Sequence, residues 1–400
     1  MWLALGGWRR ACVPLLGEPV AGRRELKLVD QVRRDCAARD GYGNNIGSSA
    51  TVNPVWSGWR CLRSAVRAVA AASLAGGAVA RDAASHVPAA PASASVSLAA
   101  WHGDGHVRGV VDLSSPRVDG SVLVAAAGRL LVRSPDGGVR AFAPAYSAPP
   151  GLEPYIALSS GLRVAGAGCR FAPHALYALR LAGSDGVTEI APSGGRVRRF
   201  AALPGRGLEN GIAFDRTGRF GHRLLVTASV SGRTTVFAID CRGHVTVLTR
   251  SAPRVEGGVA VAPASFGRFG GDLIAPDELS GRLYAIAPSG SVRQLAVSPT
   301  LHGQDVGVES EGFLPRRFGA ALVADRLTRR NRHPGDDLIL SLSRSALRAG
   351  GARTGDLLVV DEGGAATIAV SCGAPACHVH RIADGPPEAH IEGHVVFTQP

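Results

Sequence analysis

Short apolar runs that alternate with polar residues or are rich in β-branched residues fill the chain from about residue 117 onward. Gly, Pro-Ser-Gly or Asp-Gly turns interrupt these runs about every ten residues. Short runs with a period of two, separated by tight turns, are typical of β-strands joined as hairpins. The pattern therefore predicts an all-β fold in which consecutive strands pair with one another.

Four of the predicted hairpins resemble one another closely. After its turn, each has a strand that opens with valine, and these valines are 58, 48 and 47 residues apart: Val139, Val197, Val245 and Val292. A repeat of this length that holds about four strands is the signature of a propeller blade. We therefore expect residues 117–400 to form a β-propeller.

The number of blades follows from a longer interval near the C-terminus. Val292 and Val379 are 87 residues apart, so this interval holds either one enlarged blade or two. The segment 355–362 resembles the segment 271–278 of an earlier blade, which favours two blades here and six in total. We expect one of them to be irregular around residues 341–351. The first hairpin (120–142) lacks an inner strand and the last strand (392–397) lacks partners, so the N- and C-terminal strands should share one blade, which removes free sheet edges.

A carboxylate recurs at the start of the first strand of each predicted blade. Its occurrences are Glu153, Glu209, Glu256, Asp305 and Glu392. First strands line the central channel, where converging carboxylates raise one another's pKa values unless a cation neutralises them. Oxygen ligands select hard ions such as Ca²⁺. The alternative is structural: these acids accept backbone N–H groups or pair with arginines.

The strand starts resemble those of gluconolactonase/regucalcin-like six-bladed propellers, which have kinship to NHL-type propellers. The resemblance covers about residues 117–400 and rests on Glu-Asn-Gly-Ile-Ala-Phe-Asp at 209–215 and related starts. In that family a Glu, an Asn and an Asp hold a divalent metal at the channel mouth. The resemblance implies Glu153 and Asn210 as ligands, while Glu256-Gly257 stands where the family has Asp-Gly. The full expected set is Glu153, Glu209, Asn210, Glu256, Asp305 and Glu392.

The family resemblance implies a metal-dependent hydrolase acting on a lactone or ester. Asp277 and His302 are the candidate proton acceptors, although His302 also suits an ordinary loop position. A serine hydrolase is excluded because no Gly-x-Ser-x-Gly occurs in a strand-turn-helix context. The alternative function is a non-catalytic extracellular propeller that binds a glycan, peptide or small molecule and in which the ion is structural. Fold alone does not choose between them.

An export signal is predicted ahead of the propeller. Three arginines (Arg60, Arg63 and Arg67) precede a thirteen-residue apolar run at 68–80 that ends in Ala-Val-Ala, and Ala-Ser-Ala follows at 92–94. This is the layout of a secretory signal peptide. We therefore expect residues 1–59 to be a non-native or disordered extension, 60–80 the signal peptide, 81–116 an Ala/Pro/Ser-rich linker, and the mature protein to be secreted.

Four cysteines lie in the predicted propeller, an even number that suits disulfides in an exported protein. The turn 373–376 can bring Cys372 and Cys377 within bonding reach. A zinc site with His378 and His380 is the alternative, although the spacing matches no common structural zinc motif. The other two cysteines of the set are Cys169 and Cys241.

The net charge of +12 does not indicate nucleic-acid binding. Half of the excess lies in the first 95 residues, the arginines elsewhere are scattered, and no basic stripe is interleaved with aromatic residues. No run of eighteen apolar residues occurs, so no membrane-spanning helix is predicted. We expect a monomer whose partner is a small molecule or glycan.

Overall fold

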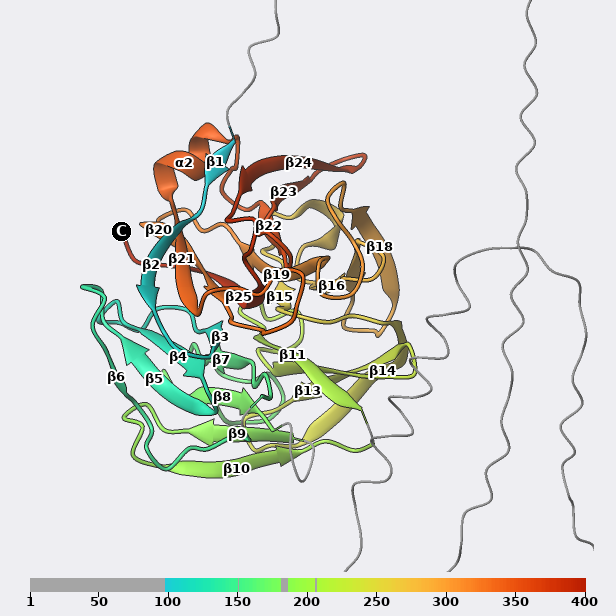
Figure 1. The fold of residues 1–400 in the computed structure, drawn as a ribbon. Coiled ribbons are helices and arrows are strands. Elements are labelled where there is room, and N and C mark those ends of the chain that lie inside the picture. Colours follow the sequence, from blue (N-terminus) through green and yellow to red (C-terminus); the bar gives the residue numbers. More distant parts are fainter. Residues whose placement is uncertain (1–97, 150, 181–185, 206) are drawn as a thin grey trace, which may run out of the picture. The chain divides into compact units, whose positions relative to one another are not determined.

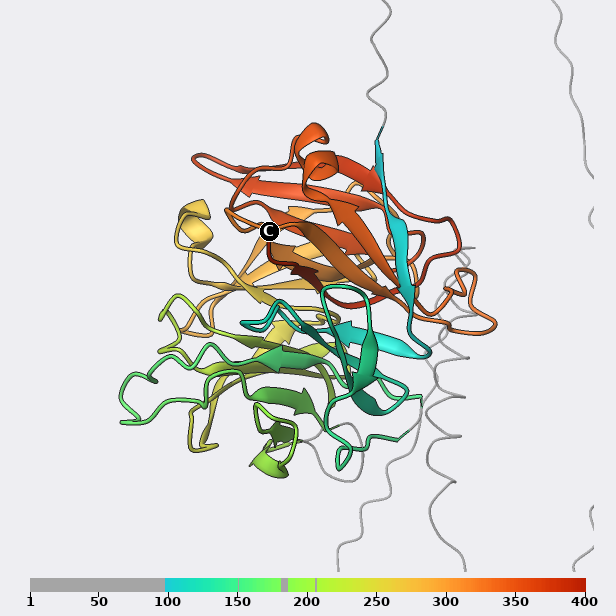
Figure 2. The same cartoon turned by 90° about the vertical axis from the view of Figure 1, so that its left-hand side faces the viewer.

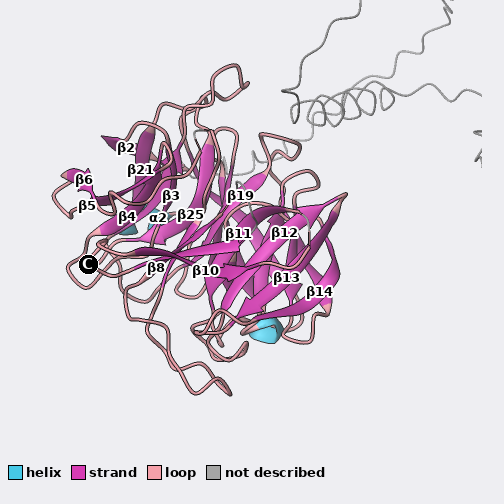
Figure 3. Ribbon diagram, turned by 90° about the horizontal axis from the view of Figure 1, so that it is seen from below, coloured by secondary structure: helices cyan, strands magenta, loops and turns pink. Residues whose placement is uncertain are grey.

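The computed structural model describes residues 98–149, 151–180, 186–205 and 207–400. Nearly all regular structure in this part is strand, and the exceptions are the short helix α2 (Arg344–Ala349) and the 3-10 turn η1 (Gly267–Phe269) (Figure 3). None of its helices is long and apolar enough to cross a membrane. The predicted extension (1–59) and signal peptide (60–80) lie outside the described residues.

Six sheets surround a common centre, so the described domain is a six-bladed β-propeller, as predicted (Figure 1). The first four blades use consecutive strands, with the first of each innermost. They are β3 (Val110–Leu113), β4 (Val122–Ala126), β5 (Arg129–Arg133) and β6 (Val139–Ala141); β7 (Ile156–Leu158), β8 (Leu176–Leu179), β9 (Gly186–Ile190) and β10 (Val197–Ala202); β11 (Leu208–Phe214), β12 (Leu224–Val230), β13 (Arg233–Ile239) and β14 (Val245–Pro253); β15 (Ala260–Val261), β16 (Leu273–Asp277), β17 (Arg282–Ile286) and β18 (Val292–Val297).

The last two blades are interleaved along the chain. The inner strand of blade five, β19 (Val308–Phe313), is followed by two strands of blade six, β20 (Ala320–Asp325) and β21 (Leu338–Ser343). The chain then passes through α2 and returns to complete blade five, and it ends as the inner strand of blade six. These strands are β22 (Leu357–Asp361), β23 (Thr367–Cys372) and β24 (Cys377–Asp384) in blade five and β25 (Ile391–Phe397) in blade six.

The two ends of the described chain meet in blade six, as predicted. β2 (His102–His106) pairs with β21 on the outside of this blade, and β25 is its inner strand. β1 (Ala99–Ala100) runs parallel to β24 at the edge of blade five, so the N-terminal segment joins two blades (Figure 2).

One part of the predicted ring closure was wrong, namely the missing inner strand of the first blade. The hairpin at 120–142 does not lack an inner strand, because β3 supplies it. Three strands therefore lie before residue 117, in the expected linker. They gave no clear signal because β2 is polar and mostly exposed, and β3 is a four-residue strand buried on both faces, so neither alternates.

The tripeptide Arg-Phe-Gly occurs at 219–221, 268–270 and 317–319 and marks equivalent positions in the ring. Its three phenylalanines are all buried, and each lies just before a second-position strand, namely β12, β16 or β20. In the third case that strand belongs to the next blade, because of the interleaving. The phenylalanines are Phe220, Phe269 and Phe318. Burial of such large side chains between neighbouring blades is what holds the ring together.

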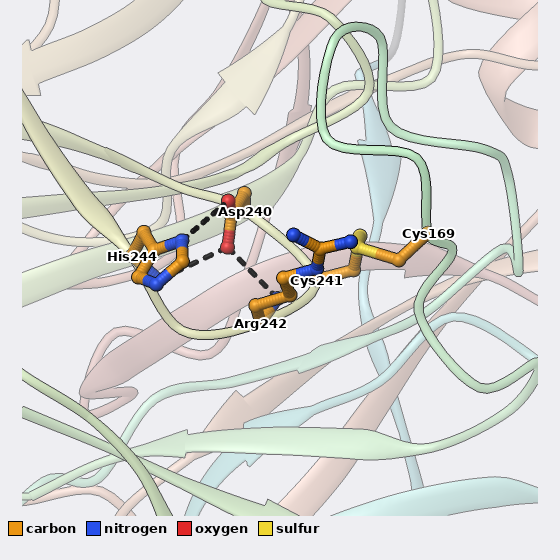
Figure 4. Close-up of a disulfide and its surroundings, with 5 residues drawn as sticks. All are labelled: Cys169, Asp240, Cys241, Arg242 and His244. Carbon is orange, nitrogen blue, oxygen red and sulfur yellow. Dashed lines mark hydrogen bonds and ion pairs between the residues drawn. A yellow bond between two sulfur atoms is a disulfide. The ribbon is translucent and has the colours of Figure 1, made fainter.

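All four cysteines of the propeller are in disulfides. Cys372 and Cys377 are paired, as the turn between them predicts, with Cα atoms 4.1 Å apart. Cys169, in the loop between β7 and β8, bonds Cys241, in the turn between β13 and β14, and so links blades two and three (Figure 4). Because both cysteines near His378 and His380 are bonded, the zinc alternative is wrong.

Candidate metal centre in the central channel

Acidic side chains gather at the end of the channel where the inner strands begin. Glu392 is the second residue of β25, and His390 lies just before that strand. Glu309 is the second residue of β19, and Glu362 directly follows β22. All four side chains are buried. Strands from blades five and six therefore bring these groups to one place.

Two carboxylates and one imidazole converge closely enough to hold a metal ion. His390 Nε2 lies 3.2 Å from Glu362 Oε1 and 3.4 Å from Glu392 Oε1. One ligand atom from each side chain lies within 4.8 Å of the other two. Glu362 Oε2 has no hydrogen-bond partner among the described residues. Buried polar atoms in proteins are normally satisfied, so this donor set fits a bound cation.

Tyr155 joins Glu309 to Glu392, one of the three clustered ligands. Its hydroxyl oxygen lies 2.7 Å from Glu309 Oε1 and 2.8 Å from Glu392 Oε2. A hydroxyl has one proton and donates it to one acceptor at a time. Burial, together with the Glu392 charge, raises the pKa of Glu309 well above its usual range. The Tyr155 hydroxyl therefore donates to either carboxylate and holds the two close together.

The acids of the cluster differ in protonation. Burial raises the pKa of Glu362 to about 12, and the charges of Glu392 and Glu309 act in the same direction. Burial also acts to raise the pKa of Glu392, but the hydrogen bond and charge of His390 and the charge of Arg326 hold it below its usual value. Without a cation, Glu392 carries the negative charge of this cluster and Glu362 holds a proton.

Two arginines pair with the acids nearer the mouth. Arg326 contacts Glu153 and lies 3.4 Å from Glu392. Arg254 contacts Glu256, and its Nη2 lies 3.2 Å from Glu278 Oε1. Among the expected ligands, Glu153 and Glu256 are therefore engaged with arginines, the arrangement that the structural alternative describes.

Glu209 and Asn210, on β11, are engaged with the surrounding backbone. The Glu209 carboxylate accepts N–H groups from Arg180, at 3.1 Å, and from Gly186. Asn210 Nδ2 donates to the Val255 carbonyl at 2.6 Å. The amide also bonds Ser229 and Thr227. Asp305 is exposed in the loop before β19.

Four of the expected ligands nevertheless share one small pocket beside the cluster. Its volume is about 150 Å³, and its lining includes Glu153, Glu209, Asn210, Glu256 and Tyr155. Burial and the neighbouring Glu278 raise the pKa of Glu256 to about 7. This pocket therefore holds a carboxyl group that exchanges a proton near neutral pH.

The two candidate proton acceptors lie apart from the three clustered ligands. Asp277, at the end of β16, accepts a hydrogen bond from the Ser280 hydroxyl and is buried. His302 is exposed in a loop beside Gly281. Neither lines the pocket that contains Glu256.

The cluster contains residues that the sequence analysis missed: Tyr155, Glu309, Glu362 and His390. Glu362 had a usable signal, because Asp-Glu ends both related segments, 271–278 and 355–362, and thereby makes Glu278 and Glu362 equivalent. Glu278 and Glu362 lie close enough in the channel for Glu362 to affect the pKa of Glu278. The acids at the starts of first strands recur more often in the sequence than this second set, so they gave the stronger signal.

A second buried acid, Asp112, ties the inner strands together deeper in the channel. Its carboxylate accepts the Ile156 N–H at 2.7 Å and the His394 N–H at 2.8 Å, and it lies 3.0 Å from His394 Nδ1. His394 Nε2 donates to the Ile212 carbonyl at 3.0 Å. Burial alone would lower the pKa of His394, but the Asp112 charge raises it above its usual value. One ion pair thus connects β3, β7, β11 and β25.

Comparison with known proteins finds only distant likenesses among solved structures. No protein-family model and no curated protein matches the chain. The chain resembles solved propellers in fold. A structure described as that of a candidate gluconolactonase shares 12% identity, covers 76% of this chain and 94% of its own, and has a TM-score of 0.40. Virginiamycin B lyase from Staphylococcus aureus shares 13% identity, with 68% and 84% coverage and a TM-score of 0.36.

Proposed function

We propose that Glu362, His390 and Glu392 hold one divalent cation and that the protein uses it to hydrolyse a lactone or ester. The main support for the cation is the convergence of three buried donors, one of which, Glu362, has an oxygen without a partner in the described chain. Converging acids need neutralisation in a buried site. The fold resemblance to a candidate gluconolactonase motivates the choice of reaction, which rests on analogy.

The kinds of ligand atom in the cluster indicate which ion it would bind. The repeated carboxylates alone favour Ca²⁺, a hard ion that takes oxygen ligands. His390 adds a nitrogen donor, and imidazole suits first-row ions such as Mn²⁺ or Zn²⁺ better than Ca²⁺. We therefore propose a first-row divalent ion and retain Ca²⁺ as the competing ion.

The surrounding residues supply binding and proton transfer. A bound divalent ion polarises a carbonyl and lowers the pKa of water. Glu256, with its pKa of about 7, is suited to accept a proton at neutral pH. Arg254 Nη1 is buried and has no partner among the described residues, so it can donate to an oxygen of the substrate. Glu256 is therefore a better candidate base than Asp277 or His302.

A cation should raise the melting temperature of the chelator-treated protein. At a hundredfold excess over Kd, binding to the native state stabilises it by about 2.7 kcal/mol. Thermal unfolding would be followed with Mn²⁺, Zn²⁺, Ca²⁺ or EDTA. Glu362→Gln combined with Glu392→Gln should abolish the shift, whereas the exposed Glu388→Gln should retain it. Identical curves in all four conditions, with elemental analysis free of metal, would refute the site.

The second candidate function is a binding propeller in which the ion is structural. It is favoured by the pairing of Glu153 and Glu256 with arginines, which engages two acids that face the pocket. A panel of lactones and esters, tested with and without the stabilising ion, separates the two functions. Hydrolysis that needs the ion and is lost in Glu256→Gln supports the enzyme. A stabilising ion without turnover supports the binding propeller.

We also propose that the protein is exported. Two disulfides in the described domain support this, because disulfides persist mainly in oxidising compartments. The mature chain should begin after Ala80 or Ala94, the two predicted cleavage positions. N-terminal sequencing of protein collected outside native host cells measures this. Recovery of residues 1–59 on that protein would contradict the predicted signal.

A further inference from the structure

The channel contains a second hollow at the opposite end from the carboxylates. Its volume is about 450 Å³, and residues from the inner strands of all six blades line it. The acidic pocket is lined by residues at or just before the starts of inner strands. This cavity is lined by residues farther along the inner strands and by residues of the loops that follow them. β25 illustrates the division, because Glu392 belongs to the metal cluster and Val395–Phe397 line the cavity.

Apolar side chains form part of the wall of this cavity, and polar atoms contribute about as much of its lining. Leu113 ends β3 and Ile156 begins β7. Ile212 and Phe214 lie on β11, and Val259 directly precedes β15. Small-molecule sites typically have volumes of roughly 300–1,000 Å³ and combine apolar surface with a few polar groups. The cavity has the size of such a site and offers both kinds of contact.

One buried polar side chain in this lining lacks a partner. Glu311, on β19, is fully buried, and its Oε1 accepts the Ala260 N–H at 3.1 Å. Its Oε2 has no partner among the described residues. Leaving a buried polar atom unpaired is costly, so a ligand oxygen that bonds Oε2 would remove that cost. Burial raises the pKa of Glu311 well above its usual range, so the carboxyl group can act as the donor.

The outer end of the cavity is positively charged. Arg216 and Arg317 line it, and both are exposed. Arg216 Nη2 donates to Ser115 Oγ at 3.0 Å, which positions its guanidinium near the opening. Inside, His394 is already paired with Asp112 and the Ile212 carbonyl. Arg216 and Arg317 therefore place two guanidinium groups at the opening, and guanidinium groups bind carboxylates well.

We propose that this cavity binds an elongated organic carboxylate. The carboxylate pairs with Arg216 and Arg317, the apolar body lies along the inner strands, and a hydroxyl or carbonyl oxygen at the far end accepts a hydrogen bond from Glu311. This site is separate from the cation site and does not depend on the proposed hydrolysis.

Isothermal titration calorimetry with three probes of equal chain length tests the proposal: octanoate, ω-hydroxyoctanoate and octylammonium. We expect ω-hydroxyoctanoate to bind more tightly than octanoate, and octylammonium to bind most weakly. Combining Arg216→Ala with Arg317→Ala should weaken both carboxylates by about tenfold or more, since each 1.4 kcal/mol changes affinity tenfold. The adjacent exposed Arg316→Ala, which does not line the cavity, is the matched control.

Variants of Glu311 test the inner end. Glu311→Gln retains a donor and should keep the preference for ω-hydroxyoctanoate, whereas Glu311→Leu should abolish the preference and leave octanoate binding. The proposal is overturned if no carboxylate binds, if octylammonium binds as tightly, or if the arginine pair can be removed without loss. The cation-induced melting shift, measured on the same arginine variant, should be unchanged. Failure of this proposal is thereby distinguished from failure of the metal site.

Discussion

Replacing Asp112 with alanine should lower the free energy of unfolding by about 3–5 kcal/mol, the usual cost of removing one partner of a buried ion pair. The carboxylate is fully buried and accepts the backbone N–H groups of Leu113, Ile156 and His394 as well as bonding the His394 ring. Without it, three backbone donors and an imidazole lose this acceptor. Urea denaturation followed by tryptophan fluorescence measures the change.

Two variants make this result interpretable. Asp384→Ala removes an aspartate whose pair with Arg381 is exposed, and such pairs contribute about 0–1 kcal/mol. Asp112→Asn keeps an acceptor oxygen and should fall between alanine and wild type. A loss below about 1 kcal/mol for Asp112→Ala would show that the ion pair does not hold the inner strands together.

Removing the Cys169–Cys241 disulfide should cost about 4 kcal/mol, because the bond closes a long loop in the unfolded chain. The two cysteines are 72 residues apart. The Cys372–Cys377 disulfide closes a separation of 5 residues and should contribute about 2 kcal/mol by the same relation. Chemical denaturation of the two double alanine variants under oxidising conditions measures both values.

The difference between the two disulfides is the informative quantity. Both double variants lose two cysteines and retain the other bond, so they serve as controls for one another. An equal loss would indicate that local packing around the cysteines, and not loop closure, determines their contribution. A larger loss for the shorter loop would contradict the prediction outright.

The blade count could be predicted because local chemistry repeats. Valines open equivalent strands in the first four blades, and Phe220, Phe269 and Phe318 occupy equivalent buried positions in three places, so several blades left similar marks on the sequence. The first blade was harder to recognise because β3 is buried on both faces and shows no alternation. A strand without alternation has no period to detect.

The candidate site was predicted only in part, for a topological reason. Glu392 was expected in the channel and lies in the cluster, but Glu362 follows a second-position strand and His390 precedes an inner one. Which of many acids meet depends on the crossing between blades five and six, and the repeat does not encode that crossing. Asp112 was missed for a similar reason, since its partners lie 44 and 282 residues away.

The interleaving of the last two blades also limits how this chain can change. In the first four blades one contiguous segment carries a whole sheet, so a single segment can in principle be duplicated, exchanged or deleted. In blades five and six, β19 pairs with β22 and β20 pairs with β25 across intervening strands of the other blade. No single cut separates these sheets. The smallest transferable unit here is the pair of blades together with β1 and β2, which come from before blade one, so evolution or engineering must gain or lose these parts together.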